Sequence, residues 1–176
     1  MTDALTDRVR RAIREVRDFP TPGIVFKDIT PVLADAALLG EVLRAMAAPF
    51  VGIGITHVVA IESRGFLFAT PIAQSLGAAL TLVRKPGKLP WKTVREAFAL
   101  EYGNDVLEMH SDALSDGSRV LIVDDVLATG GTAAAAIRLV QRLGGTVGGV
   151  SVLGEIAVLR GRARLTDMNV HAIVRY

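Results

Sequence analysis

Most of this 176-residue chain alternates between continuous apolar runs and segments in which apolar residues recur at helical spacing. The runs predict buried strands at residues 57–61, 78–83, 119–125, 146–156 and 169–176. The spacing predicts helices at residues 35–48, 65–77 and 132–143. Strands and helices in this order predict an α/β fold, in which a mainly parallel, twisted sheet is flanked by helices.

The N-terminal segment, about residues 1–33, predicts a helix followed by an ordered loop. The helix places five apolar residues on one face: Leu5, Val9, Ala12, Ile13 and Val16. The loop spans residues 17–33 and is broken by Pro20, Pro22, Gly23 and Pro31. The charged start resembles neither a signal peptide nor a membrane anchor, and no apolar run approaches the ~18 residues of a membrane span. We therefore expect a cytoplasmic protein with no membrane partner.

Length and composition fit one self-sufficient globular domain over residues 1–176. Hydrophobic residues make up 51% of the chain, an excess that suggests a buried sheet or an oligomer interface. The formal net charge of +2 is too small to argue for a nucleic-acid partner. The absence of cysteine excludes disulfides and thiolate metal sites.

The clearest chemical signal is VLIVDDVLATGGTAAAAI at residues 120–137, where a predicted strand ends in two adjacent carboxylates, Asp124 and Asp125. In such sheets ligands bind beyond the carboxyl ends of the strands, and backbone N–H groups at a helix start bind phosphate. Five residues would form this phosphate cup: Ala128, Thr129, Gly130, Gly131 and Thr132. No lysine follows the glycines, which disfavours a nucleoside triphosphate loop.

The acidic pair suits a ribose. A sugar whose 5-phosphate occupies the cup would present its 2- and 3-hydroxyls to Asp124 and Asp125, because carboxylates accept several hydrogen bonds. The structural alternative is that Asp125 caps a turn and Asp124 is a solvated strand end. The complete string of hydrophobic strand, acidic pair and ATGGT resembles the 5-phosphoribosyl-1-diphosphate (PRPP) loop of the type I phosphoribosyltransferases.

Further strings resemble one branch of that family, the adenine phosphoribosyltransferases: IESRGFLFATPIA, RKPGKLP with the downstream ALEYG, and FPTPGIVFKDITP. The resemblance implies purine salvage by a homodimer that converts adenine and PRPP to AMP and pyrophosphate. It also implies Mg²⁺ held through PRPP oxygens and water, with no direct protein ligand. Two alternatives stay open: a phosphoribosyltransferase for another nucleobase, and a PRPP-sensing regulator.

Ser63, Arg64 and Gly65 follow a predicted strand and open a helix, which predicts a second anion site. Arg64 can hold a phosphate through two hydrogen bonds, and the resemblance makes this segment the pyrophosphate loop. A serine nucleophile is the alternative. It is disfavoured because Ile61 stands where a nucleophile elbow has glycine, and no motif pairs a histidine with Ser63.

A cationic segment at about residues 84–97 predicts a mobile lid that closes over pyrophosphate and excludes water. Its expected pyrophosphate contacts are Arg84, Lys85 and Lys88, with Gly87 as a possible hinge. A solvated charged face is the structural alternative. Trp91 departs from the smaller residue that is more common in the family.

The resemblance assigns adenine to a hood within residues 1–33, where Val25 and Phe26 contact the base, with Leu127 as the opposite wall. Phe26 as a plain core residue is the alternative. Glu101 lies in FALEY (98–102), which with VLEMH (106–110) forms a predicted antiparallel pair. By the resemblance it aligns with the acid that faces the purine nitrogens. Glu101, Arg64, Asp124 and Asp125 form the expected catalytic set.

Overall fold

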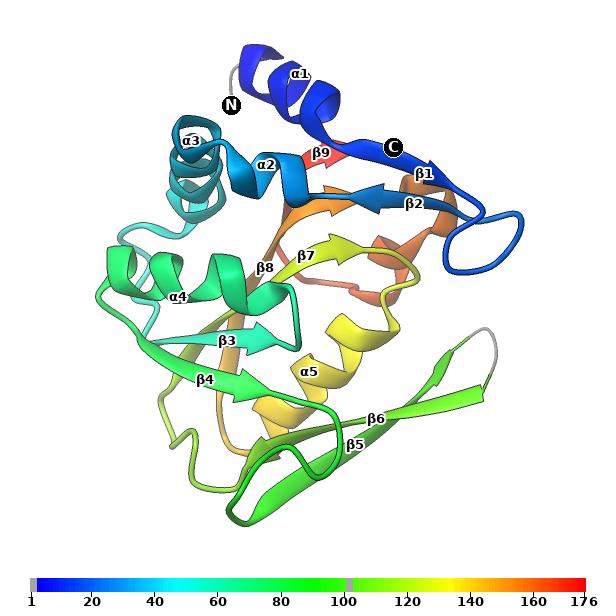
Figure 1. Ribbon diagram of the computed structural model, residues 1–176. Helices are drawn as coiled ribbons and strands as arrows, with labels where there is room; N and C mark the ends of the chain where they lie inside the picture. The colour runs from blue at the N-terminus through cyan, green and yellow to red at the C-terminus, as the bar shows by residue number, and fades with distance from the viewer. Residues whose placement is uncertain (1–2, 101–102) are drawn as a thin grey trace. The chain divides into compact units, whose positions relative to one another are not determined.

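The structure is a computed structural model that describes residues 3–100 and 103–176 (Figure 1). The chain forms two compact units, Met1–Ala45 and Met46–Tyr176. The first unit contains α1 (Asp3–Ala12), β1 (Arg14–Arg17), β2 (Val25–Asp28), α2 (Thr30–Ala34) and most of α3 (Ala36–Ala47). The second unit contains the parallel sheet.

The N-terminal unit differs from its sequence-based prediction in two places. The helix predicted through Val16 ends at Ala12, and the predicted loop at 17–33 contains β2 and α2. The cause is pairing between β1 and β2, in which Val16 lies opposite Phe26 and an Arg14–Asp28 ion pair at 3.3 Å joins the strands. The spacing of apolar residues along the chain cannot predict this pairing, because formation of β1 depends on the presence of its partner strand β2.

The second unit has a five-stranded parallel sheet in the order β4-β3-β7-β8-β9. Its strands are β3 (His57–Ile61), β4 (Ala79–Val83), β7 (Arg119–Leu127), β8 (Thr146–Glu155) and β9 (Val170–Arg175). All five follow the predicted strands within a few residues. This confirms the predicted parallel α/β fold.

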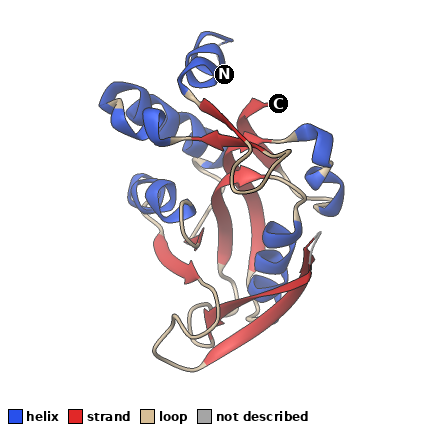
Figure 2. Cartoon of the chain, turned by 45° about the vertical axis from the view of Figure 1, so that its right-hand side comes forward, coloured by secondary structure: helices blue, strands red, loops and turns tan. Residues whose placement is uncertain are grey.

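Helices cover the two faces of this sheet, as the two views in Figures 1 and 2 show. α4 (Gly65–Leu76) connects β3 to β4, and α5 (Gly131–Arg142) connects β7 to β8. The two connections run in opposite directions across the sheet, so right-handed crossovers place α4 and α5 on opposite faces. β7 is therefore covered on both sides, and all four residues from Val120 to Val123 are buried.

An antiparallel pair of strands follows β4. It consists of β5 (Thr93–Leu100) and β6 (Gly103–His110), and α5 packs against it. The last five residues of the lid segment predicted at 84–97 lie in β5, so the irregular part of that segment ends before Thr93. Two short 3₁₀ helices between β8 and β9, Ala157–Leu159 and Gly161–Arg164, were not predicted.

Candidate functional site

The candidate site lies at the carboxyl ends of β3 and β7, which are neighbours in the sheet. The connection after β3 leads to one side of this pair and the connection after β7 leads to the other. Open α/β sheets bind ligands at such a switch point, because the diverging chains leave a crevice above the strand ends. The topology therefore brings together the two segments that the sequence predicted as anion sites.

Asp124 and Asp125 occupy the end of β7. Asp125 is only 4% exposed, whereas Asp124 is half-buried. The backbone N–H of Asp125 donates to Asp124 Oδ1 at 2.8 Å. Loss of solvent around the Asp124 carboxyl, and then repulsion from Asp125, raise the pKa of Asp124 well above the usual aspartate value. The pair is thus a site where cations or hydroxyl donors are favoured, not a solvated strand end.

Arg64 lies against the acidic pair at the start of α4. Its Nε is 2.7 Å from Asp125 Oδ2. The neighbouring Gly65 makes this approach possible, since a Cβ there would lie 2.9 Å from the Val123 carbonyl oxygen and 3.0 Å from Asp124 Oδ1. The Glu62–Ser63 peptide just before Arg64 is cis. The predicted pyrophosphate loop and the acidic pair are therefore in direct contact.

The predicted phosphate cup forms the turn from β7 into α5. Gly130 has a positive φ of 80°, which glycine adopts without steric cost, and α5 begins at Gly131. N–H groups in a first helical turn have no partner within the helix, so those of α5 can bind an anion. A pocket of about 60 Å³ lies beside this turn and is lined by Asp124, Leu127, Ala128, Thr129, Gly130 and Thr132, among others.

Gly161 packs against the backbone of this cup, and no local sequence pattern indicates its role. A Cβ at Gly130 would lie 2.3 Å from the Gly161 carbonyl oxygen, and a Cβ at Gly161 would lie 2.1 Å from the Ala128 carbonyl oxygen. The two backbones are therefore in close contact. Gly130 and Gly161 are far apart in the chain, so their contact is visible only in the three-dimensional structure.

Glu62 is a second residue that the sequence analysis did not single out. Arg84 donates from Nε and Nη2 to the two Glu62 carboxylate oxygens at 3.2 and 2.9 Å, and the Lys85 N–H donates to Oε2 at 3.0 Å. These contacts, the Arg84 hydrogen bonds above all, hold the pKa of Glu62 below its ordinary value. Glu62 thus joins the predicted pyrophosphate loop to the start of the cationic segment.

The cationic segment is anchored at several points. Lys85 Nζ lies 2.7 Å from Asp105 Oδ2, and the Gly87 N–H donates to the buried Glu108 at 3.1 Å. Lys88 accepts a hydrogen bond from Arg84 at its carbonyl oxygen. Trp91 is 63% exposed. Residues 84–92 therefore have defined contacts at their start and an exposed aromatic side chain near their end.

The residues expected at adenine are distributed over both units. Val25 is 45% exposed, and the half-buried Phe26 makes an edge-to-face contact with Phe19 at 5.1 Å between ring centroids. Leu127 is 2% exposed and lines the pocket beside the cup. Glu101 lies outside the described residues. The structure therefore gives the surroundings of three of the four.

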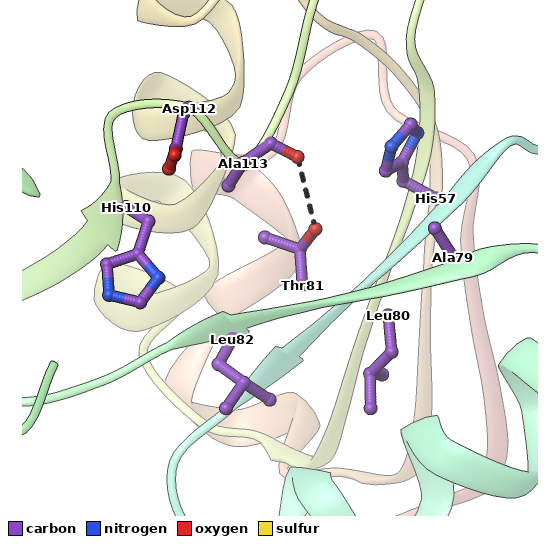
Figure 3. A pocket seen from close by; sticks show the side chains of 8 residues that line it. All are labelled: His57, Ala79, Leu80, Thr81, Leu82, His110, Asp112 and Ala113. Carbon is purple, nitrogen blue, oxygen red and sulfur yellow. Dashed lines mark hydrogen bonds between the residues drawn. The ribbon is translucent and has the colours of Figure 1, made fainter. Parts of the chain in front are cut away.

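Another pocket, of about 260 Å³, lies along the edge strand β4 and is lined by His57, Thr81, His110 and Asp112, among others (Figure 3). The Thr81 hydroxyl donates to the Ala113 carbonyl oxygen there at 3.4 Å. His57 begins β3 (His57–Ile61) and Ser63 lies beyond the other end of this strand, so the length of the strand separates the two side chains. This separation agrees with the argument against a serine nucleophile paired with His57.

The acidic pair at the end of β7 supplies carboxylate oxygens, the type of ligand atom that Mg²⁺ prefers. Within residues 3–100 and 103–176, no group of three or more His, Cys, Asp or Glu side chains is placed to hold a metal. Mg²⁺ commonly keeps several waters and binds through substrate phosphates with one or two carboxylates. A metal that is held through PRPP oxygens and water, as the resemblance implies, requires no further carboxylates from the chain.

No helix in the described part of the chain has the length and apolar content needed to cross a bilayer.

Comparisons with known proteins extend over nearly the whole chain. A family model described as a phosphoribosyl transferase domain matches residues 36–167. A protein of Anaeromyxobacter dehalogenans (strain 2CP-C) named adenine phosphoribosyltransferase is 55% identical over 172 residues, which are 98% of this chain and 100% of that protein.

Two solved structures are also similar. The adenine phosphoribosyltransferase of Rhodothermus marinus matches with a TM-score of 0.95 and 50% identity, covering 99% of this chain and 100% of that one. The adenine phosphoribosyltransferase of Saccharomyces cerevisiae, solved with D-2,5-dideoxy-2,5-imino-altritol 1,6-bisphosphate and adenine, matches with a TM-score of 0.91 and 34% identity. That match covers 98% of this chain and 99% of the other.

Proposed function

The chain belongs to the adenine phosphoribosyltransferase family, and from this premise we propose how its residues share the family's reaction. The enzyme transfers the 5-phosphoribosyl group of PRPP to adenine, giving AMP and pyrophosphate in purine salvage. The contact between Arg64 and Asp125 is the observation that supports the proposed roles of these residues most directly. It places a cation for the leaving pyrophosphate next to carboxylates for the ribose.

The phosphate cup binds the 5-phosphate in this proposal. The N–H groups at the start of α5 and the Thr129 and Thr132 hydroxyls are its donors, and Ala128, Gly130 and Gly131 leave room for the anion. Asp124 and Asp125 accept hydrogen bonds from the ribose 2- and 3-hydroxyls. The raised pKa of Asp124 supports this role, because hydroxyl donors and positive charge on the sugar compensate its unfavourable environment.

The bond from the anomeric carbon to pyrophosphate breaks as N9 of adenine approaches from the opposite face. Positive charge grows on the ribose ring, as in glycoside cleavage, and negative charge grows on the leaving oxygen. Arg64 neutralises the leaving group, together with Ser63 and Gly65 backbone groups and the cations Arg84, Lys85 and Lys88. The acidic pair meanwhile favours the positively charged ring.

Adenine is held by Val25 and Phe26 and by Leu127 in this proposal. An aromatic ring stacked on a base contributes ~1–3 kcal/mol. Glu101 faces the purine nitrogens and stabilises the positive charge that adenine acquires as N9 bonds to the anomeric carbon, until the N9 proton is released to solvent. Residues 84–92 act as the lid that excludes water from the reacting carbon.

Mg²⁺, a homodimeric assembly and a cytoplasmic location complete the proposal. Mg²⁺ is held through PRPP oxygens and water, with no direct protein ligand, and when bound it neutralises the charge of the pyrophosphate group. The small formal net charge of +2 and the two predicted anion sites support small-molecule ligands over nucleic acid.

The test is a coupled assay of AMP formation with adenine, hypoxanthine, guanine and xanthine offered separately against PRPP and Mg²⁺. We expect turnover with adenine and at least about 10³-fold lower kcat/KM for the oxo-purines, since a site built to bind one set of donors rejects the other. Preference for an oxo-purine would assign the chain to another nucleobase. Tight PRPP binding without turnover of any base would favour a sensor.

A further inference from the structure

The phosphate cup has a second layer of backbone behind it. Gly161 and Gly130 are in contact so close that a Cβ on either one would overlap the other segment, at 2.3 Å for Gly130 and 2.1 Å for Gly161. Gly161 begins the 3₁₀ helix Gly161–Arg164. The direction of the cup's N–H groups therefore depends on where this helix lies.

Arg162 fixes that helix to the sheet. Its Nε and Nη2 donate to the two carboxylate oxygens of Glu155 at 3.2 and 2.6 Å, and its Nη1 donates to the Val170 carbonyl oxygen at 2.7 Å. Two parallel bonds from a guanidinium to a carboxylate fix orientation as well as distance. Arg162 is adjacent to Gly161, so this anchor acts directly on the segment behind the cup.

Glu155 connects the anchor to the strand that carries the acidic pair. It is 2% exposed at the end of β8 and lies opposite Leu127 of β7 in the sheet register. Arg175 of β9 makes a second ion pair with Glu155 at 3.1 Å. Hydrogen bonds from Arg162, then burial working against them, leave the pKa of Glu155 below its ordinary value, so the carboxylate stays charged.

We propose that Glu155 and Arg162 are positioning residues for the 5-phosphate, acting through the backbone contact between Gly161 and the Ala128–Gly130 turn. The inference rests on the assignment of the cup to the 5-phosphate. It predicts an effect on ligands that carry that phosphate, PRPP and AMP, and little effect on pyrophosphate, which binds at the Ser63–Gly65 segment.

Arg175 provides a matched control. Both arginines pair with Glu155, but only Arg162 belongs to the segment that contacts the cup. Removing either one weakens the same carboxylate's ion pairing, so a general loss of stability is common to both variants. A loss specific to AMP separates positioning from stability.

The experiment is calorimetric titration of the full chain and its Arg162→Met, Arg162→Lys and Arg175→Met variants with AMP and with Mg²⁺–pyrophosphate. Arg162→Met should weaken AMP binding by about tenfold, or ~1.4 kcal/mol, and Arg162→Lys by less, because lysine keeps the charge but not the fork. Arg175→Met should stay within about twofold of the parent chain for both ligands, and pyrophosphate affinity should change less than about twofold in every variant.

Equal losses for AMP and pyrophosphate, or equal AMP losses in Arg162→Met and Arg175→Met, would overturn the positioning role. So would parental AMP affinity in both Arg162 variants. Failure of the parent chain itself to bind AMP would instead count against the cup as the 5-phosphate site, and would remove the basis of this inference. Thermal unfolding of each variant shows that the titrated protein is folded.

Discussion

Arg64 Nε and Asp125 Oδ2 lie 2.7 Å apart, so a residue assigned to pyrophosphate directly contacts a residue assigned to the ribose. A guanidinium has five N–H donors, so one arginine can contact a carboxylate and an anion together. The side chain proposed to stabilise negative charge on the leaving group, Arg64, therefore contacts the side chain proposed to stabilise positive charge on the sugar, Asp125.

Replacement of Arg64 tests its assignment to the leaving group. Arg64→Gln should lower kcat/KM for PRPP by about 10²-fold, because the lost cation stabilises charge that grows in the transition state. AMP binding, measured by titration, should change far less, since AMP has no pyrophosphate. If AMP and PRPP lose affinity equally, Arg64 serves the whole site and not the leaving group.

Asp124→Asn tests the ribose role and has a stability signature that depends on pH. The folded pKa of Asp124 is raised, so the folded protein favours the protonated form. Its contribution to stability is fully present below the unfolded aspartate pKa of about 3.9 and declines as pH rises through the higher folded pKa. Removing the charge should therefore raise Tm at pH 7 and leave Tm nearly unchanged near pH 3.5.

The same variant should lose activity while it gains stability. Loss of a charge-assisted hydrogen bond to a ribose hydroxyl should reduce kcat/KM by roughly 10- to 100-fold, equivalent to ~1.5–3 kcal/mol. Steady-state kinetics and thermal unfolding at both pH values provide the measurement. Undiminished activity, or a lower Tm at pH 7, would contradict the role or the pKa shift respectively.

Glu62 is predicted to hold the base of the lid segment. Glu62→Gln should raise the KM for PRPP by about tenfold, because Arg84 and Lys85 lose a common carboxylate partner close to the expected pyrophosphate. The matched control is Glu41→Gln, which removes a carboxylate paired with Arg8 at 2.8 Å within the N-terminal unit. A similar KM in both variants would show that Glu62 has no part in PRPP binding.

Gly65 is predicted to be required for the close approach of α4 to the acidic pair. A Cβ at this position meets a backbone carbonyl at 2.9 Å, so Gly65→Ala should destabilise the protein by ~1–3 kcal/mol and lower activity with it. Gly40→Ala, in α3, is the control, since its Cβ meets only the end of the Arg44 side chain, at 3.5 Å. Chemical denaturation should show Gly40→Ala as neutral or stabilising.

Glu101 is predicted to act on the base. Glu101→Gln keeps the size of the side chain and removes its charge, and should lower turnover by on the order of 10²-fold with a smaller effect on adenine affinity. Kinetics in the direction of AMP synthesis, at saturating PRPP and Mg²⁺, measure both quantities. A loss of turnover below about fivefold would remove Glu101 from the catalytic set.

Some features of this protein are determined by contiguous sequence. The apolar runs specify the parallel strands, because a strand covered on both faces must be apolar at every position, as Val120 to Val123 are. The acidic pair, the glycine turn and the Ser63–Gly65 segment are local motifs, and each lies at the predicted strand end or helix start. The proline-containing segment at residues 17–33 was the exception: it was predicted as a loop, but it contains β2, which is stabilised by pairing with β1.

Tertiary structure alone decided which of these motifs meet. The order of β3 and β7 in the sheet brings Arg64 to Asp125, although sixty residues of chain lie between them, and no local pattern encodes that neighbour relation. The roles of Glu62 and Gly161 could not be predicted from the sequence for the same reason, because each depends on contact with residues distant in the chain. Glu62 pairs with Arg84, and Gly161 lies so close to Ala128 that no Cβ fits. Local chemistry follows from residue type and spacing, whereas pairing across the sheet follows from packing of the whole chain.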